Sequence, residues 1–494
     1  MDSILFWNKV ALDAAKTDFS LPDPRPPDLV PQQPGPTYAS RALAIVHLAM
    51  YDAFVGIMGG ANTYLTYAPA PTASGVLPSA RAAVAAAACL TLIAMYSRQK
   101  ESILKTHSAY LTQLSAGGSG VGEGLAWGHV VAARMLAARK NDGADASDDQ
   151  YAPSSEPGSH RPDPYSPTQG YLGPRWGAVQ PFGFNDIRSA LTPLPEPRTL
   201  PEYAADFASV VALGRKANST RTLDQTTVGL FWAYDGARNI GVPPRLYNQV
   251  VRRIVRRIGS VTEAQNARLF AMVNVAMADA GIQAWHEKYT HNLWRPVVGV
   301  READADWGPT GTGDNHAGLA GDPYWEPLGA PRTNSSGRES FTPNFPAYPS
   351  GHATFGTAAL RVAQIELLGG VNDIDFRFVS DELNGENVGA TGVRPRHSRQ
   401  LTIAKAIEEN ILSRVFLGIV LVYIFKVAPP SETQRSETFR CTMTTTRPLM
   451  PLPHIIHIPL PSGGSAGEAG ATLPPPPTFR LMAPVSPPVP QFKL

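Results

Sequence analysis

The sequence predicts a mainly α-helical protein with long irregular loops. Apolar residues recur at helical spacing along most of the chain, and no stretch alternates apolar and polar residues long enough to indicate a strand. Segments dense in Pro and Gly, from Asn141 to Pro201 and from Glu302 to Pro349, separate the helical stretches. With 43% hydrophobic and 17% charged residues, the chain can bury a large core.

The spacing of apolar residues places each predicted helix. In chain order they are Ser40 to Met58, Ala80 to Tyr96, Glu101 to Leu114, Gly122 to Ala138, Tyr247 to Ile258, Thr262 to Trp285, His352 to Leu368 and Leu401 to Gly418. We interpret residues 141–201 as a surface loop packed on the helices. The chain then divides into an N-terminal helical half with this long loop (1–200), a C-terminal helical half (201–426) and a Pro-rich, low-complexity tail (427–494) that we expect to be disordered.

Composition excludes several classes of partner. Forty-three Lys and Arg against 41 Asp and Glu leave a net charge of +2, so we expect no nucleic acid and no anionic membrane as partner. The two cysteines, Cys89 and Cys441, provide no disulfide framework. The N-terminus has no long apolar core typical of a signal peptide, so a cytoplasmic protein is the default expectation. The apolar run from Val415 to Phe425 is shorter than the ~20 residues of a membrane span.

The first chemically informative segment carries two cations. Lys288 and Arg295 are seven residues apart, which is two helical turns, so both can share a face near the end of a predicted helix that Pro296 encourages to stop. A Lys and an Arg on one face are more often part of a solvated surface, and spacing alone leaves that alternative open.

Two further segments add groups that bind anions. Ser350 can cap the helix that follows, Gly351 lets a ligand approach the backbone amides, and His352 titrates near neutrality and can move protons. An ordinary N-cap with an incidental histidine is the alternative. Arg414 lies inside an apolar stretch, where its guanidinium needs a buried carboxylate or an oxyanion as partner.

Taken in order, the three segments resemble the vanadium-dependent haloperoxidases of the type-2 phosphatidic acid phosphatase superfamily. The pattern is Lys, six residues, Arg-Pro; then Pro-Ser-Gly-His; then Ser-Arg. The likeness runs from about Phe6 to Ile419, and outer motifs resemble the chloroperoxidase branch: Ala39 to His47, Phe231 to Gly236 and Pro243 to Gln249. The resemblance implies two four-helix-bundle-like halves, with the site at the end of one bundle.

The resemblance also implies roles for particular residues. Lys288, Arg295 and Arg414 would neutralise the oxygens of bound vanadate, Ser350 and the Gly351 amide would complete the cradle, and His352 would be the acid/base residue. In the family, peroxide replaces oxygens on vanadium, the lysine polarises it, and a halide attacks it to give hypohalous acid. Trp285 and Phe345 match the halide pocket, although core aromatics are the commoner explanation. Asp235 would orient an arginine, with a solvent-facing loop carboxylate as the alternative.

The sequence departs from the family where the third motif ends. The family has a His six residues after this arginine and an Asp four residues later, but those positions are Val420 and Ile424 here. That His is the protein group bonded to vanadium, and in the phosphatases it is the nucleophile; valine has no lone pair for either role. We hypothesise that the sequence after Ile419 is a gene-model artefact, which tail peptides detected in protein from the natural source would contradict.

Three functions remain open. The first is a haloperoxidase-like enzyme that uses hydrogen peroxide, a halide and a small organic substrate at bound vanadate, impaired by Val420. The second is an acid or phosphatidate-type phosphatase, since phosphate fits the same cradle. The third is an inactive protein that binds phosphate or vanadate. Halide choice, organic substrate and oligomeric state do not follow from the sequence.

Overall fold

A computed structural model describes residues 2–421 except 23–25, 27–28, 69, 71–76, 116–118, 149, 185, 187–194, 200–201, 315–318 and 337–339. The longer helices are α1 (Ser3–Asp18), α2 (Gly35–Met58), α3 (Ala80–Met95), α4 (Lys100–Ser115), α5 (Val121–Ala138), α7 (Tyr203–Gly214), α8 (Leu223–Phe231), α9 (Pro243–Ile258), α10 (Glu263–His291), α12 (Gly351–Leu368) and α13 (Ile403–Phe416). The predicted mainly α fold is confirmed.

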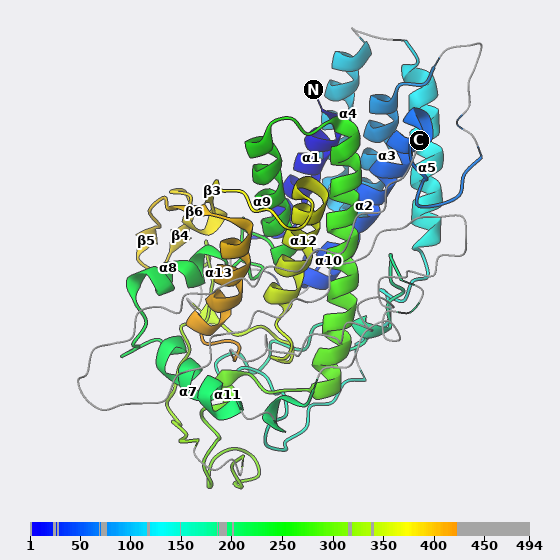
Figure 1. Cartoon of the computed structure of the whole chain (residues 1–494). Helices are drawn as coiled ribbons and strands as arrows, with labels where there is room; N and C mark the ends of the chain where they lie inside the picture. Colours follow the sequence, from blue (N-terminus) through cyan, green and yellow to red (C-terminus); the bar gives the residue numbers. More distant parts are fainter. Residues whose placement is uncertain are drawn as a thin grey trace, which may run out of the picture.

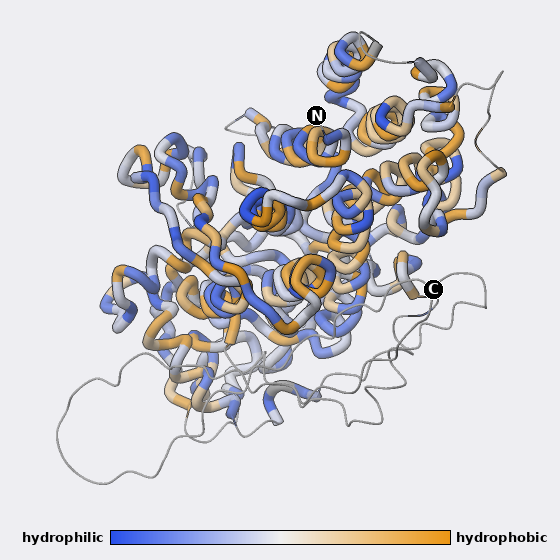
Figure 2. The backbone as a smooth tube through the Cα atoms, turned by 45° about the horizontal axis from the view of Figure 1, so that its top comes forward, coloured by the Kyte–Doolittle hydropathy of each residue, from blue (hydrophilic) through white to orange (hydrophobic). Residues whose placement is uncertain are grey.

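The helices form two groups that share α10, the long helix at the centre of Figure 1. On one side α2 packs along α10 and contacts α3 and α5, and on the other side α12 packs along α10 and contacts α9 and α13. In Figure 2, orange apolar residues recur along the helices and are interrupted by blue hydrophilic ones, as expected where helices bury one face against one another. The boundaries predicted at residues 200 and 426 stay predictions.

Every helix predicted from apolar spacing is present, with ends shifted by a few residues. Helices α1, α7 and α8 were not predicted, and neither was a single helical turn, α11 (Pro296–Gly299). The short α8 has a capping box, in which Thr222 and Gln225 bind each other's backbone amides. Local capping of this kind starts a helix even where the apolar pattern is too short to show it.

Short antiparallel strands interrupt the loops. Strand β1 (Ala330–Pro331) pairs with β2 (Ser340–Phe341), β3 (Phe376–Val379) with β6 (Ser398–Leu401), and β4 (Val388–Gly389) with β5 (Gly392–Val393). Each strand has two to four residues. Such strands are too short for alternation in the sequence to reveal them.

The segment 141–201 is more than the predicted surface loop. Its described part contains two short 3-10 turns, η2 (Trp176–Ala178) and η3 (Pro197–Thr199), and otherwise irregular backbone. However, the side chains of His160, Asp163 and Trp176 are buried, and His160 donates its backbone N–H to the carbonyl of Asn292. Residues 158–160 therefore run beside 292–294, so this segment forms part of the wall around the C-terminal end of α10.

Among the described residues, α2 is the one helix long and apolar enough to cross a membrane. It was not singled out by the sequence analysis, which considered the run from Val415 to Phe425. Within the fold, 78% of the most apolar window of α2 is buried, against α10 and α3 above all. Packing in the core accounts for its apolar composition.

Gly418 turns the chain directly after α13. Its φ is +70°, and a Cβ at this position would lie 2.5 Å from the carbonyl oxygen of Gly214. We expect Gly418→Ala to lower the free energy of unfolding by about 2–4 kcal/mol, because strain and a backbone clash add together. Urea unfolding measures this, and Gly259→Ala is the control, since Gly259 has φ +78° with open space around it. A loss of only about 1 kcal/mol in both variants would contradict the clash.

Candidate oxyanion site

Three helix ends meet at one place in the fold. Lys288 lies in the last turn of α10, Ser350 is the N-cap of α12, and Arg414 lies in the last turn of α13. The C-terminal ends of α10 and α13 and the N-terminal end of α12 all point towards the lower half of Figure 1. They surround a cavity of about 600 Å³. All the residues proposed from the sequence line it: Asp235, Trp285, Lys288, Arg295, Phe345, Ser350, Gly351, His352 and Arg414, together with Val420.

Arg295 reaches the cavity by a different route from the one predicted. Helix α10 ends at His291 because Asn292 adopts a left-handed conformation (φ +47°), and Arg295 is the N-cap of the separate turn α11. The prediction that Lys288 and Arg295 share one helical face was therefore wrong. Pro296 starts a helix as its first residue rather than ending one.

Lys288 is completely buried and has no carboxylate partner among the described residues. Its Nζ donates to the carbonyl oxygens of Pro346, at 2.8 Å, and of Pro349, and it lies 5.1 Å from the ring centre of Phe345. Burial, and then the charge of Arg295, lower the pKa of Lys288 well below its usual range. A nearby anion would restore the charged form.

Arg414 is held by a carboxylate but keeps one donor free. Its Nη1 lies 3.0 and 2.9 Å from the two carboxylate oxygens of Asp235, whose side chain is buried and whose pKa is raised by that burial. Arg414 Nη2 has no hydrogen-bond partner among the residues that the structure describes. Burial of a guanidinium donor without a partner is costly, so this donor indicates a missing acceptor.

Arg295, like Arg414, is held by hydrogen bonds on one side of its guanidinium group. Its Nε donates to the carbonyl of Phe345 (2.8 Å) and its Nη1 to the carbonyl of Ile419 (2.9 Å), while its Nη2 finds no partner in the described part of the chain. Burial lowers the pKa of Arg295 to about 9, and Asp235 opposes that shift. Among the described residues, Arg414 alone of these three basic side chains is bonded to a carboxylate, and such a basic cluster suits an oxyanion.

The N-terminus of α12 supplies neutral donors. The Ser350 side chain accepts from the Ala353 amide at 3.4 Å, which confirms Ser350 as the N-cap. Gly351 follows as the first residue of an 18-residue helix, whose end carries partial positive charge. Both residues line the cavity, so the Ser350 hydroxyl and the first amides of α12 lie beside the three cations.

His352 differs from the expectation that it titrates near neutrality. Its Nε2 lies 2.5 Å from the carbonyl oxygen of Ala233, and Arg414 Nη1 lies 3.2 Å from the same nitrogen. Burial, followed by the charge of Arg414, lowers its pKa well below the usual range. The protein groups around it keep the ring neutral, and an anion among the cations would shift that pKa upward.

The aromatic pair proposed for the halide pocket lies against the cations. The ring centres of Trp285 and Phe345 are 4.8 Å apart, and the Trp285 indole N–H donates to the Leu172 carbonyl. The Arg295 guanidinium carbon lies 4.9 Å from the Phe345 ring centre. The two rings therefore form an apolar wall next to positive charge.

Sequence reasoning missed other parts of the cavity wall. Phe19 and Val30 come from the segment between α1 and α2, whereas Thr333 and Asn344 come from the segment that contains β1 and β2. No motif marks these residues, and they are far from Lys288 along the chain. Only the folded arrangement brings them to the cavity.

The chain is similar to known proteins over most of its length. The vanadium chloroperoxidase of Curvularia inaequalis is 32% identical over 499 aligned positions, which cover 84% of this chain and 78% of that protein. The family model for the vanadium chloroperoxidase N-terminal domain matches residues 1–171, and the model for the second helical-bundle domain of these enzymes matches residues 268–421. The chain belongs to the vanadium haloperoxidase family.

Solved structures of vanadium haloperoxidases share the fold. A bacterial vanadium-dependent iodoperoxidase superposes with a TM-score of 0.62 at 20% identity, over 84% of this chain and 91% of that one. A holo-type bacterial vanadium-dependent chloroperoxidase superposes with a TM-score of 0.58 at 16% identity, over 82% and 89%. At these identities the likeness concerns the helical architecture.

Val420, the position where the sequence analysis expects the histidine of the family pattern, lines the cavity. The chain turns at Gly418, the carbonyl of Ile419 accepts from Arg295, and the Val420 side chain is 2% exposed. The position therefore lies in the wall of the cavity that the three basic residues also line, but its side chain offers only carbon. Ile424 and the tail histidines His454 and His457 lie outside the described residues.

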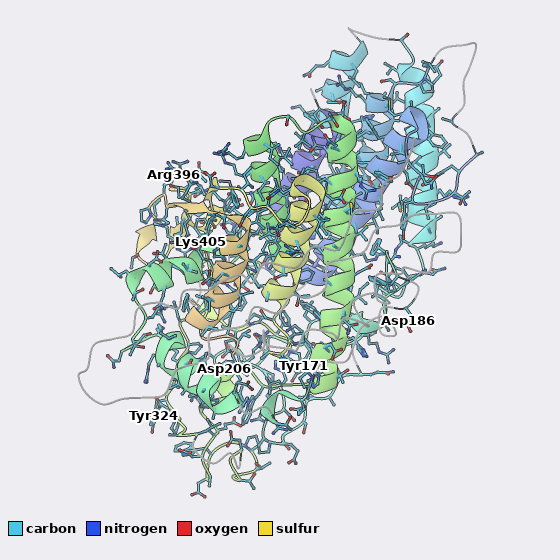
Figure 3. All side chains as sticks on the ribbon, viewed as in Figure 1. Tyr171, Asp186, Asp206, Tyr324, Arg396 and Lys405 are labelled. Atoms are coloured by element: carbon cyan, nitrogen blue, oxygen red, sulfur yellow. The ribbon has the colours of Figure 1, made fainter. Side chains whose placement is uncertain are left out.

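Arg394, which follows β5, and Arg399, which lies in β6, have carboxylate partners. Arg394 pairs with Glu382, and Arg399 pairs with Asp224 and Glu409. Arg396 is exposed, and Figure 3 shows it at the outer edge of the molecule. Two of these three arginines are therefore fixed by carboxylates rather than directed to the cavity.

Proposed function

We propose that this chain binds a tetrahedral oxyanion, vanadate or phosphate, in the cavity as a haloperoxidase-like protein, and that Val420 impairs its peroxidase chemistry. One observation carries the proposal: Lys288, Arg295 and Arg414 are buried together with a single directly bonded carboxylate, and two of their guanidinium nitrogens lack partners among the described residues. Such excess positive charge is costly to bury unless an anion completes it.

The residues fit vanadate as an anion but not as a metal centre. Charge and N–H donors match the oxygens of the group, whereas Val420 provides no nitrogen for vanadium. In the described ranges, no three His, Cys, Asp or Glu side chains are grouped to hold a metal ion. Bound vanadate would supply activation of hydrogen peroxide towards a halide, and it would be held here by charge and hydrogen bonds alone.

The chain's own groups would act on the bound anion in distinct ways. Lys288, Arg295 and Arg414 would neutralise its oxygens, and Ser350 with the Gly351 amide would orient it. His352, kept neutral by its surroundings, would accept a proton as the anion offsets the nearby positive charge. The Trp285 and Phe345 rings would border the halide, and a small organic substrate would receive the halogen.

Two assays run side by side test the proposal. We expect oxidation of bromide, with vanadate and peroxide, to be weak but above the protein-free rate, and hydrolysis of a phosphate ester to be absent, because Val420 cannot form the phospho-enzyme. Hydrolysis without bromide oxidation would support a phosphatase instead. Activity in neither assay, together with tight phosphate binding, would indicate an anion-binding protein without catalysis.

Phosphate alone is expected to stabilise the fold. At 100 times its dissociation constant, a ligand that binds only the native state adds about 2.7 kcal/mol to the free energy of unfolding. Thermal unfolding with and without phosphate measures this. We expect the stabilisation to be lost in Arg295→Gln and kept in Arg396→Gln, since Arg396 is exposed. Equal stabilisation of both variants would place the phosphate elsewhere.

A further inference from the structure

A second buried carboxylate lies behind the cavity wall. Glu382 belongs to the 3-10 turn η4 (Asp381–Leu383) and is 0% exposed. Its Oε2 accepts from the hydroxyl of Thr333 at 2.5 Å and from Arg394 Nη1 at 2.7 Å. Its Oε1 has no hydrogen-bond partner among the described residues. The two oxygens therefore differ: Oε2 faces the Thr333 hydroxyl, so a proton carried on Oε2 is the one that can reach Thr333.

Thr333 connects this carboxylate to the cavity. It lines the cavity and is itself buried, and its hydroxyl also accepts from Arg394 Nη1 at 2.7 Å. With Glu382 ionised, the Thr333 hydroxyl donates to Glu382 Oε2. When Oε2 carries a proton, the hydroxyl accepts from it instead, and the Thr333 proton can turn towards the cavity. Asp235 and His352 are not linked to Glu382 in this way. Asp235 is hydrogen-bonded to Arg414, and the His352 ring is hydrogen-bonded to the carbonyl of Ala233.

Burial and the charged groups around Glu382 together bring its pKa close to neutral pH. Burial above all, and the negative charge of Asp235, raise its pKa to about 7, although Arg394 and the Thr333 hydrogen bond lower it. The neighbouring Asp381 is paired with Arg245. The Tyr234 phenol, whose own pKa is raised well above its usual range, stays neutral. At neutral pH, Glu382 is thus close to balance between its two forms.

We propose that Glu382 is a proton-exchanging carboxyl coupled to anion binding in the cavity, and that the Thr333 hydroxyl passes the proton between them. An arriving anion adds negative charge near a carboxylate, so Glu382 takes up a proton; when the anion leaves, the proton returns. This deepens the proposed function and rests on it only in taking the cavity as an anion site.

The exchange has a use in the proposed reaction. Oxidation of a halide by hydrogen peroxide consumes one proton: halide, peroxide and proton give hypohalous acid and water, with two electrons passing from the halide to the peroxide. The proton on Glu382 passes to the Thr333 oxygen as Thr333 releases its own hydroxyl proton to the cavity. Glu382 is left as a carboxylate paired with Arg394, ready to be protonated again from solvent. Glu382 thus acts through Thr333 as a positioning residue.

Sulfate is the probe that separates protein protons from ligand protons, because it stays a dianion at neutral pH whereas phosphate titrates there. Calorimetry of sulfate binding in two buffers with different enthalpies of ionisation gives the number of protons taken up. If binding raises the pKa of Glu382 by one unit, the wild-type chain takes up about 0.4 proton per sulfate more than Glu382→Gln at about pH 7. Lys288 and His352 contribute equally to both proteins, so the difference belongs to Glu382.

The threonine is tested by a matched pair. Thr333→Ser keeps the hydroxyl and Thr333→Val removes it at the same volume. After rapid mixing with sulfate and a pH indicator, we expect proton uptake at the wild-type rate in the serine variant and at least about tenfold slower uptake in the valine variant. Should Glu382→Gln fail to fold, Arg394→Gln replaces it, because loss of that cation shifts the pH of maximal proton uptake upward.

The outcomes are distinguishable. Sulfate bound with equal proton uptake in the wild-type chain and in Glu382→Gln would overturn the coupling while leaving the anion site intact. No sulfate binding at all would overturn the anion site and the coupling together. Equal rates in the two threonine variants would overturn the role of Thr333.

Discussion

Val420→His is expected to raise the rate of bromide oxidation, with vanadate and peroxide, by at least about 100-fold. The loss of a group that only orients a metal ligand costs about 10- to 100-fold in affinity or activity, and a ligand itself should matter more. The Val420 side chain lines the cavity that contains Lys288, Arg295 and Arg414, and the 600 Å³ of space leaves room for an imidazole. A nitrogen there can bond vanadium, which valine cannot.

The control for this variant is Val420→Phe, which adds a ring of similar shape without a nitrogen. We expect it to show no gain in bromide oxidation, and we expect vanadate to bind at least about tenfold more tightly to Val420→His than to either other protein. If the phenylalanine variant gained as much as the histidine variant, filling of the cavity would explain the effect, and the missing ligand would not be the cause of low activity.

Arg414→Met is expected to have the largest combined effect on stability and anion binding. Removal of the guanidinium leaves Asp235, whose side chain is 5% exposed, without its charge partner. Breaking a buried ion pair in this way costs about 3–5 kcal/mol. The anion also loses charge-assisted hydrogen bonds, so phosphate affinity should fall about 10- to 100-fold. Urea unfolding and calorimetry measure the two effects separately.

The double variant Arg414→Met with Asp235→Asn separates the two roles of Arg414. We expect it to regain about 2 kcal/mol of the lost stability, since no unpaired buried charge remains, while phosphate affinity stays as low as in the single variant. If the double variant regained phosphate binding as well, Arg414 would serve the fold alone, and the anion would depend on Lys288 and Arg295.

Much of the fold could be predicted because the apolar spacing of long helices survives in the sequence. Helices α2, α10 and α12 have both the length and the periodicity to be recognised. The missed elements are short, or are defined by hydrogen bonds between distant segments, as in the pairing of β3 with β6. Pro296 was taken as the signal that ends the helix, but α10 ends earlier, at His291, because Asn292 adopts the left-handed conformation.

The candidate site could be predicted in its residue types but not in its connections. Lys288, Ser350 and Arg414 are marked by unusual local sequence, since each is a charged or small polar residue beside an apolar helix. The partner of Arg414 was left open between a carboxylate and an oxyanion, and the structure provides Asp235, which is 179 residues away along the chain. Nothing in the sequence near Glu382 or Thr333 connects them to the cavity.

By itself, the sequence determined the helical class, the cationic residues of the site and the presence of valine at position 420, because these depend on local pattern and residue identity. Only the tertiary structure decided that Arg295 reaches the cavity from a separate turn, that Asp235 is the carboxylate bonded to Arg414, and that Val420 lines the same cavity. The physical reason is that the burial of a side chain and the charge around it depend on all the residues that lie near it in space. Those residues come from segments that lie far apart along the chain.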